Sequence, residues 1–168
     1  SLSAFVVDLN LPGVSRNAPE DMTGLRTSAI GTLSFDGVEL PATSLLGREG
    51  AGAWIFMNAM EWERIGILAA SLGRMEAQID RCVAYARQRR PAGKPIREHQ
   101  AISHRIANMR CLVEGARLQL YRASWAKSRG QKSDRFSAQS KLVVSEAAVE
   151  VATSAIRIHG ALGLRREQ

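Results

Sequence analysis

Residues 65–83, IGILAASLGRMEAQIDRCV, place an apolar side chain at every third or fourth position. Steps of three and four match the 3.6-residue turn of an α-helix, so these side chains share one helix face. Proline does not occur between Pro41 and Pro91. We therefore predict one long amphipathic helix from about Gly50 to just before Pro91 and Gly93. Its apolar stripe consists of Ile65, Leu68, Leu72, Met75, Ile79 and Val83.

Two further segments repeat this period. We predict a second helix over about residues 96–128, with Gly130 just past its end, and a third over about residues 134–158, closing at Gly160. Their apolar faces are Ile102, Ile106, Met109, Val113, Ala116 and Leu120 in the second, and Ala138, Leu142, Val149, Ala152 and Ile156 in the third. Long helices joined by short links pack antiparallel, so we expect most of a four-helix bundle. The fourth helix would lie outside this chain or come from a partner.

The first 48 residues have the pattern of strands and turns. Residues 4–9 are a short apolar run, and residues 27–40 alternate apolar and polar positions across a turn at Phe35-Asp36-Gly37. The predicted fold class is α+β, with a partial β-barrel-like segment (1–48) followed by an antiparallel long-helix bundle of the four-helix type (49–168). Because the chain begins at Ser1 and stops at Gln168 without a helix cap, we expect it to be part of a larger protein.

The composition, with 45% hydrophobic and 23% charged residues, is that of a soluble globular protein. No apolar run approaches the roughly 18 residues of a membrane span, and no charged-then-apolar leader precedes the first strand, so we expect a cytoplasmic protein. Cys82 and Cys111 lie in separate predicted helices without a second Cys or His at metal-ligand spacing. This predicts two buried free thiols, with neither a disulfide framework nor a metal site.

The formal net charge is +7, and the basic residues concentrate locally in residues 87–97, RQRRPAGKPIR. No aromatic side chains are interleaved there to stack on bases, and no helix-turn-helix or zinc signature occurs, so nucleic acid is not the expected partner. A smaller anionic partner, such as a phosphate-bearing cofactor or an acidic protein, explains the charge as well.

A cluster of charges interrupts the helical pattern in residues 57–69, MNAMEWERIGILA. Glu63 shares its predicted face with small or apolar residues, whereas Glu61 shares its face with Arg64 and Ile65. A carboxylate that faces an enclosed apolar space is costly to ionise, which would make Glu63 a stronger base. Alternatively, Glu61 and Arg64 form an i,i+3 surface pair and Glu63 points to solvent; the period leaves both readings open. The neighbours of Glu63 are Ala59, Met60, Gly66, Ile67 and Ala70.

Four segments, in this order, resemble the acyl-CoA dehydrogenase family, from the end of its middle β-domain through most of its C-terminal helical domain. They are GLRTSAIGTLSFDGVELPATSLLG (24–47), WERIGILAASLG (62–73), RQRRPAGKPIREHQAI (87–102) and RIHGALG (157–163). The resemblance implies that a carboxylate removes the α-proton of an acyl thioester while the β-hydride passes to N5 of FAD. A minority of the family carries this base on the long helix, immediately before an arginine. The resemblance thus implies Glu63 as the base and Arg64 as the residue that orients the substrate.

The resemblance also implies contacts to FAD. The family's Arg-x-x-Phe-Gly segment has Ala92 in place of Phe, and its Gln-Ile-His-Gly-Gly segment has Arg157 in place of Gln and Ala161 in place of the second Gly. Alanine would block a close backbone approach if the position needs a positive φ, whereas Arg157 can pair with phosphate. A lone His at a helix end, such as His159, more commonly satisfies carbonyl groups. The implied cofactor-binding residues are Arg89, His99, Gln100, Arg157, His159 and Gly160.

The segments EWER (61–64) and HQAISHRIANM (99–109) are most similar to members that act on acyl groups held by a carrier protein in secondary metabolism. The resemblance implies an acyl thioester on a carrier protein or coenzyme A as substrate, and a homodimer or homotetramer. Two alternatives remain open. One is a relative that has lost FAD and performs proton transfer, elimination or cyclisation on a thioester. The other is a non-catalytic helical interaction domain.

Overall fold

The computed structural model describes residues 1–165, except for the side chain of Ala92. Three long helices dominate it: α1 (Gly52–Gln88), α2 (Gln100–Ser128) and α3 (Asp134–His159). They confirm the three predicted helices, although the second begins at Gln100 because Ile96–Glu98 forms a separate 3-10 turn. The chain divides into two compact units, Ser1–Met57 and the remainder from Asn58 onward.

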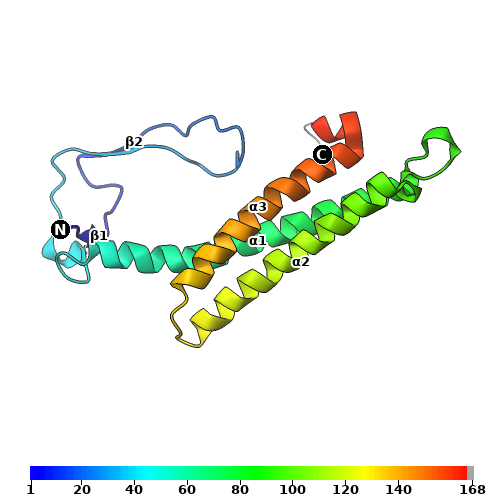
Figure 1. Ribbon diagram of the computed structural model, residues 1–168. Coiled ribbons are helices and arrows are strands. Elements are labelled where there is room, and N and C mark those ends of the chain that lie inside the picture. The colour runs from blue at the N-terminus through cyan, green and yellow to red at the C-terminus, as the bar shows by residue number, and fades with distance from the viewer. Residues whose placement is uncertain (166–168) are drawn as a thin grey trace. The chain divides into compact units, whose positions relative to one another are not determined.

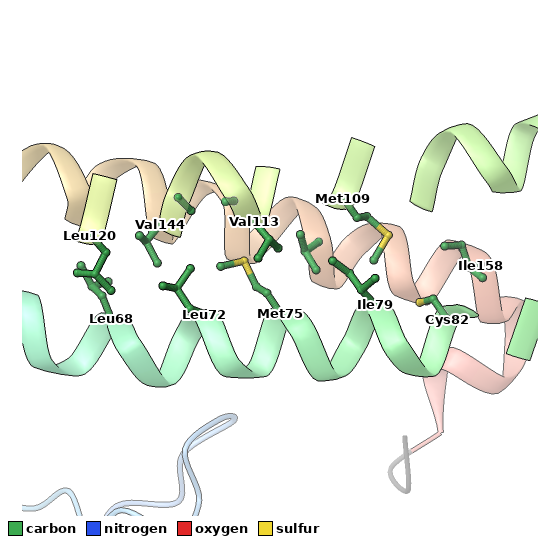
Figure 2. Close-up of a cluster of buried hydrophobic side chains, with 13 residues drawn as sticks. Leu68, Leu72, Met75, Ile79, Cys82, Met109, Val113, Leu120, Val144 and Ile158 are labelled. Carbon is green, nitrogen blue, oxygen red and sulfur yellow. The ribbon is translucent and has the colours of Figure 1, made fainter. Parts of the chain in front are cut away.

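In the helical unit, α2 and α3 run antiparallel to each other and pack with α1 around one apolar core (Figure 1). Figure 2 shows Leu68, Leu72, Met75 and Ile79 pointing from α1 into this core, which confirms the predicted stripe of the first helix. The predicted face of the second helix is confirmed as well. Its members Met109, Val113, Ala116 and Leu120 are buried, and Ile102 and Ile106 pack against them.

The predicted face of α3 is wrong. Leu142, Val149 and Ile156 are 63%, 68% and 43% exposed. The residues of α3 that are buried instead are Ser137, Ser140, Val144, Ala147, Val151, Ser154 and Ile158. The hydroxyl groups of Ser137 and Ser140 each donate to a carbonyl three residues earlier, at 2.9 Å, so their burial leaves no polar group unsatisfied.

The link between α2 and α3 is a regular helix ending. Gly130 has φ +68°, its N–H donates to the carbonyl of Lys127 at 3.0 Å, and the N–H of Gln131 donates to the carbonyl of Ala126 at 3.0 Å. This paired pattern is the Schellman motif, which favours glycine at the left-handed position and confirms the predicted stop at Gly130. Among the helices of residues 1–165, none is long and apolar enough to cross a lipid bilayer.

The N-terminal unit contains two separate two-stranded antiparallel ribbons, β1 (Ala4–Phe5) with β4 (Leu45–Leu46) and β2 (Val14–Arg16) with β3 (Leu33–Phe35). Of the predicted strand pattern in residues 27–40, only Leu33–Phe35 forms a strand; β3 pairs back with β2, and residues 38–40, after the turn at Phe35-Asp36-Gly37, form none. Gly13 allows this close pairing: it has φ +87°, and a Cβ atom there would lie 2.2 Å from the carbonyl oxygen of Asp36. The α+β class holds, but the barrel-like sheet is not confirmed.

Candidate functional site

The charged turn of α1 presents Glu61 and Glu63 to different surroundings. Glu61 precedes Leu68 by two helical turns and therefore lies on the stripe that faces the core, where its side chain is 18% exposed. Glu63 is exposed, and so are its neighbours Gly66 and Ile67. Within the described part of the helical unit, Glu63 thus lies on a solvent-exposed face. The predicted enclosed apolar surroundings of Glu63 would have to be formed by residues outside this part of the chain.

Glu61 is held by two partners from distant segments. Its Oε2 accepts a hydrogen bond from Lys127 Nζ at 2.8 Å, and its Oε1 accepts one from the hydroxyl of Ser133. The Lys127 bond first, and the Ser133 bond second, lower the pKa of Glu61 below its ordinary value. Within residues 1–165 Glu61 forms no ion pair with Arg64, so the predicted i,i+3 surface pair is wrong, whereas the other part of that alternative, a Glu63 that points to solvent, agrees with the exposure of Glu63. Arg64 contributes only a weaker charge interaction.

Arg64, next to Glu63 in the chain, has a donor without an acceptor. Its side chain is partly buried, and its Nε atom is buried without a hydrogen-bond partner among the described residues. Leaving a buried donor unpaired costs about 1–3 kcal/mol, so such groups are rare and call for an explanation. An acceptor supplied by a substrate would satisfy this donor.

Three of the predicted cofactor-binding residues lie where α1 gives way to α2. Arg89 directly follows α1; its N–H donates to the Tyr85 carbonyl at 2.9 Å, and its carbonyl accepts from Ile96 at 2.9 Å. His99 occupies the N-cap position of α2, and Gln100 is the first residue of that helix. All three side chains are exposed, so their donors remain available to a ligand.

His159, in the last turn of α3, joins this same end of the bundle. Its Nδ1 lies 2.9 Å from the carbonyl oxygen of Ala155, and its ring stacks on Tyr85 with centroids 4.6 Å apart. The predicted bond to a helix carbonyl is therefore present, and because a carbonyl oxygen only accepts, Nδ1 is the donor in it. The backbone carbonyl of Tyr85 also accepts the N–H of Arg89. Tyr85 therefore contacts both the Arg89 segment and His159.

The two cysteines differ. Cys82 is fully buried, with its Sγ 3.9 Å from Nδ1 of His159, and burial raises the pKa of this thiol to about 11. It is the packing residue that the sequence predicts. The same prediction is wrong for Cys111, which is exposed beside Leu112 on α2.

The altered glycine motif after α3 keeps an unstrained backbone. Gly160 has φ +61°, a conformation suited to glycine. Ala161 does not have a positive φ: Leu25 is the only non-glycine residue of the described chain that does. The methyl group of Ala161 thus imposes no backbone strain, and Arg157, four residues before it, is exposed.

Sequence reasoning did not find Lys127 and Ser133. A lysine in the last turn of a helix and a serine just before the next helix are ordinary capping residues. Nothing in their spacing links them to Glu61, which lies 66 and 72 positions away. Such a cluster is found only once the helices are packed.

Comparisons with known proteins agree with this architecture. The family model of the acyl-CoA dehydrogenase C-terminal domain matches residues 50–168. The L-prolyl-peptidyl-carrier protein dehydrogenase of Pseudomonas fluorescens is 41% identical over 162 residues, which cover 96% of this chain and 43% of that protein. These findings confirm the resemblance inferred from the four segments.

Solved structures show the same fold. Butyryl-CoA dehydrogenase of Megasphaera elsdenii superposes with a TM-score of 0.95 at 36% identity, over 99% of this chain and 43% of the other. A structure of PigA with FAD and proline superposes with a TM-score of 0.95 at 32% identity, over 98% and 43%. The chain thus spans less than half the length of the relatives it matches. The family match, the sequence identity to these relatives and the shared fold place this chain in the acyl-CoA dehydrogenase family.

Proposed function

We propose that the protein containing this chain is a flavin-dependent acyl-thioester dehydrogenase in which Glu63 is the catalytic base. The observation that carries the proposal is that the two glutamates of this turn of α1 differ in their side-chain partners. Glu61 is occupied by Lys127 and Ser133, whereas Glu63 has no hydrogen bond or ion pair with any described residue. A carboxylate kept unpaired beside an arginine with an unpaired donor is suited to act on a substrate.

The chemistry follows from these two side chains. The carboxylate of Glu63 takes the proton from the α-carbon of the thioester, and Arg64 donates to an acceptor of the substrate, such as the thioester carbonyl. A donor at that carbonyl stabilises the negative charge that develops as the proton leaves. FAD, when bound, supplies the acceptor for the hydride of the β-carbon.

The residues at the far end of the bundle fit a flavin nucleotide. Arg89 and Arg157 offer guanidinium groups that match phosphate, and His99 and Gln100 add further polar groups beside them. His159 and Gly160 would complete the site, since Gly160 has an open backbone in which an added Cβ atom would meet nothing within 4 Å. The unstrained Ala161 is compatible with the same role.

For the substrate we propose an aminoacyl or related group on a carrier protein, with a coenzyme A thioester as the competing possibility. The support comes from a relative named for a prolyl carrier protein and from a superposable structure that holds proline with FAD. Both carriers are anionic, which the positive charge of this chain accommodates. The free thiols fit a reducing compartment, so we place the activity in the cytoplasm.

The proposed base is tested by Glu63→Gln in the full-length protein. We expect the variant to keep the visible flavin spectrum but to lose anaerobic bleaching by an L-prolyl-carrier protein thioester, with a fall in rate of at least about 100-fold. Glu20→Gln is the matched control, because Glu20 is also an exposed carboxylate without a side-chain partner among residues 1–165. Unchanged bleaching in Glu63→Gln contradicts the assignment, and a protein that stays colourless with added FAD contradicts the dehydrogenase itself.

A further inference from the structure

Glu61, Lys127 and Ser133 connect three separate helical segments. Glu61 lies in α1, Lys127 in the last turn of α2, and Ser133 at the N-cap position of α3. The backbone carbonyl of Lys127 also accepts the N–H of Gly130 in the α2–α3 link, at 3.0 Å. This cluster, which we term the Glu61 clamp, therefore fixes α1 against the point where α2 turns into α3.

The clamp is shielded from solvent, and within it the negative Glu61 carboxylate is paired with the positive Lys127 ammonium. The side chains of Glu61 and Lys127 are 18% and 14% exposed, and Ser133 is 2% exposed. The Lys127 ammonium also lies 4.9 Å from the ring centroid of Trp62, so a second residue of the same turn of α1 holds it. A partly buried pair with several partners holds its geometry better than an exposed ion pair does.

The clamp bears directly on the proposed base through helix geometry. Successive residues of an α-helix are rotated by about 100°, so Glu63 lies about 160° around the helix from Glu61. Fixing Glu61 on the core side therefore directs Glu63 to the open side. Arg64, three residues after Glu61, lies within the same helical turn.

We propose that Glu61 is a positioning residue, which acts through the Glu61 clamp to set the orientation of the Glu63–Arg64 turn without touching the substrate. The inference rests on the proposed function, because it takes Glu63 as the base. A displacement of about 1 Å in a reacting group can cost on the order of 100-fold in rate. Loosening the clamp should therefore slow proton abstraction even in a folded protein.

The experiment compares Glu61→Gln and Lys127→Met with the unmodified full-length flavoprotein. The rate of anaerobic flavin bleaching is measured by stopped flow, over a range of L-prolyl-carrier protein concentrations and separately with butyryl-CoA. We expect both variants to lower the saturating rate by about tenfold or more, with a smaller change in the half-saturating concentration. The conservative Lys127→Arg should recover most of the rate, because a guanidinium can still pair with Glu61.

The pair Glu76–Arg117 provides a matched control. It also joins α1 to α2, with side chains 37% and 24% exposed, but Glu76 is 13 residues beyond Glu63, about 20 Å along the helix. Glu76→Gln should lower the melting temperature and leave the saturating rate within about twofold of the unmodified protein. This comparison separates a positioning effect from a general loss of stability.

The outcomes distinguish this inference from the proposed function. If Glu63→Gln is inactive while Glu61→Gln and Lys127→Met turn over normally, the positioning role is overturned and the base assignment stands. If Glu63→Gln is fully active, both are overturned. A rate loss in Glu76→Gln as large as that in Lys127→Met would also overturn the inference, because the effect would then follow stability alone.

Discussion

Glu61 and Glu63, two positions apart in α1, have different surroundings. Glu61 is partly buried, and its carboxylate accepts hydrogen bonds from Lys127 and Ser133, so its charge is compensated within the helical unit. Glu63 is exposed and makes no such bond within the described residues. The period left two readings open, a Glu63 that faces an enclosed space and a Glu63 that points to solvent, and the exposure of Glu63 agrees with the second. Small side chains on a helix do not reveal whether the residues that would cover them belong to the same segment.

Glu61 should make stability depend on acid pH. Its pKa is lower in the folded protein than the ordinary value of 4.5, chiefly because Lys127 and Ser133 bond to the carboxylate. A lowered pKa means that the pairing stabilises the fold above about pH 4.5 and that this contribution disappears as the pH falls through the lowered value. Glu61→Gln should therefore be less stable than the unmodified protein by about 1–3 kcal/mol at pH 7, with a gap that closes towards pH 3.

Urea unfolding of the two proteins at pH 7, 4.5 and 3 measures this gap. Glu20→Gln serves as the control, because its carboxylate has no side-chain partner among the described residues, and it should track the unmodified protein at every pH. A gap that stays constant from pH 7 to pH 3 would contradict the linkage, since the loss would then not arise from the ionised carboxylate.

At the scale of the element, α3 carries several large apolar residues on the outside, among them Leu142, Val149 and Ile156, while Ile158 is buried. Ser140 is fully buried, while Leu142 is 63% exposed. The buried serine donates its hydroxyl to the carbonyl of Ser137, which leaves a small, satisfied surface against the neighbouring helices. The interface of α3 therefore depends on side-chain size more than on hydrophobicity.

Exchanging a small for a large side chain at Ser140, and a large for a small one at Leu142, should affect stability to different degrees. Ser140→Leu adds volume to a close-packed interface and should destabilise the protein by about 1–3 kcal/mol, whereas Leu142→Ser should change the stability of a subunit by less than about 0.5 kcal/mol. Denaturant unfolding, followed by far-UV circular dichroism at a protein concentration at which sedimentation velocity finds dissociated subunits, measures both. Equal losses in the two variants would show that Leu142 is buried after all.

The composition of the buried faces explains which parts of the core the sequence could predict. In α1 and α2 large apolar side chains occupy the buried face, so the period alone identified Leu72 and Val113 as core. In α3 the core face is made mostly of serine, alanine and valine, with Ile158 at its end, and an apolar-period rule selected the outer stripe instead. The helix bounds were predictable from Pro91 and Gly130, which end helices for local reasons. The Lys127–Glu61 bond was not, because it depends on how separate helices pack.

At the scale of the whole molecule, the three helices leave apolar surface uncovered. Leu142, Val149 and Ile156 recur every seven residues along the exposed side of α3. A groove between α2 and α3 adds Leu112 and Val143 to this surface. Exposed apolar surface that is continuous along a helix is typical of a protein–protein interface. It supports the homodimer or homotetramer that the family resemblance implies, and we propose that the subunits meet on this surface.

Placing charges in this groove should break that assembly. Leu112 and Leu142 face the groove from α2 and α3, and burying each in an interface would contribute about 1.5–3 kcal/mol. Leu112→Glu/Leu142→Glu should therefore shift the full-length protein to a smaller species in sedimentation velocity at micromolar concentration, while far-UV circular dichroism stays unchanged. Leu118→Glu is the control, because Leu118 is 67% exposed and does not line the groove. If the double variant sediments like the unmodified protein, the groove is not the contact between subunits.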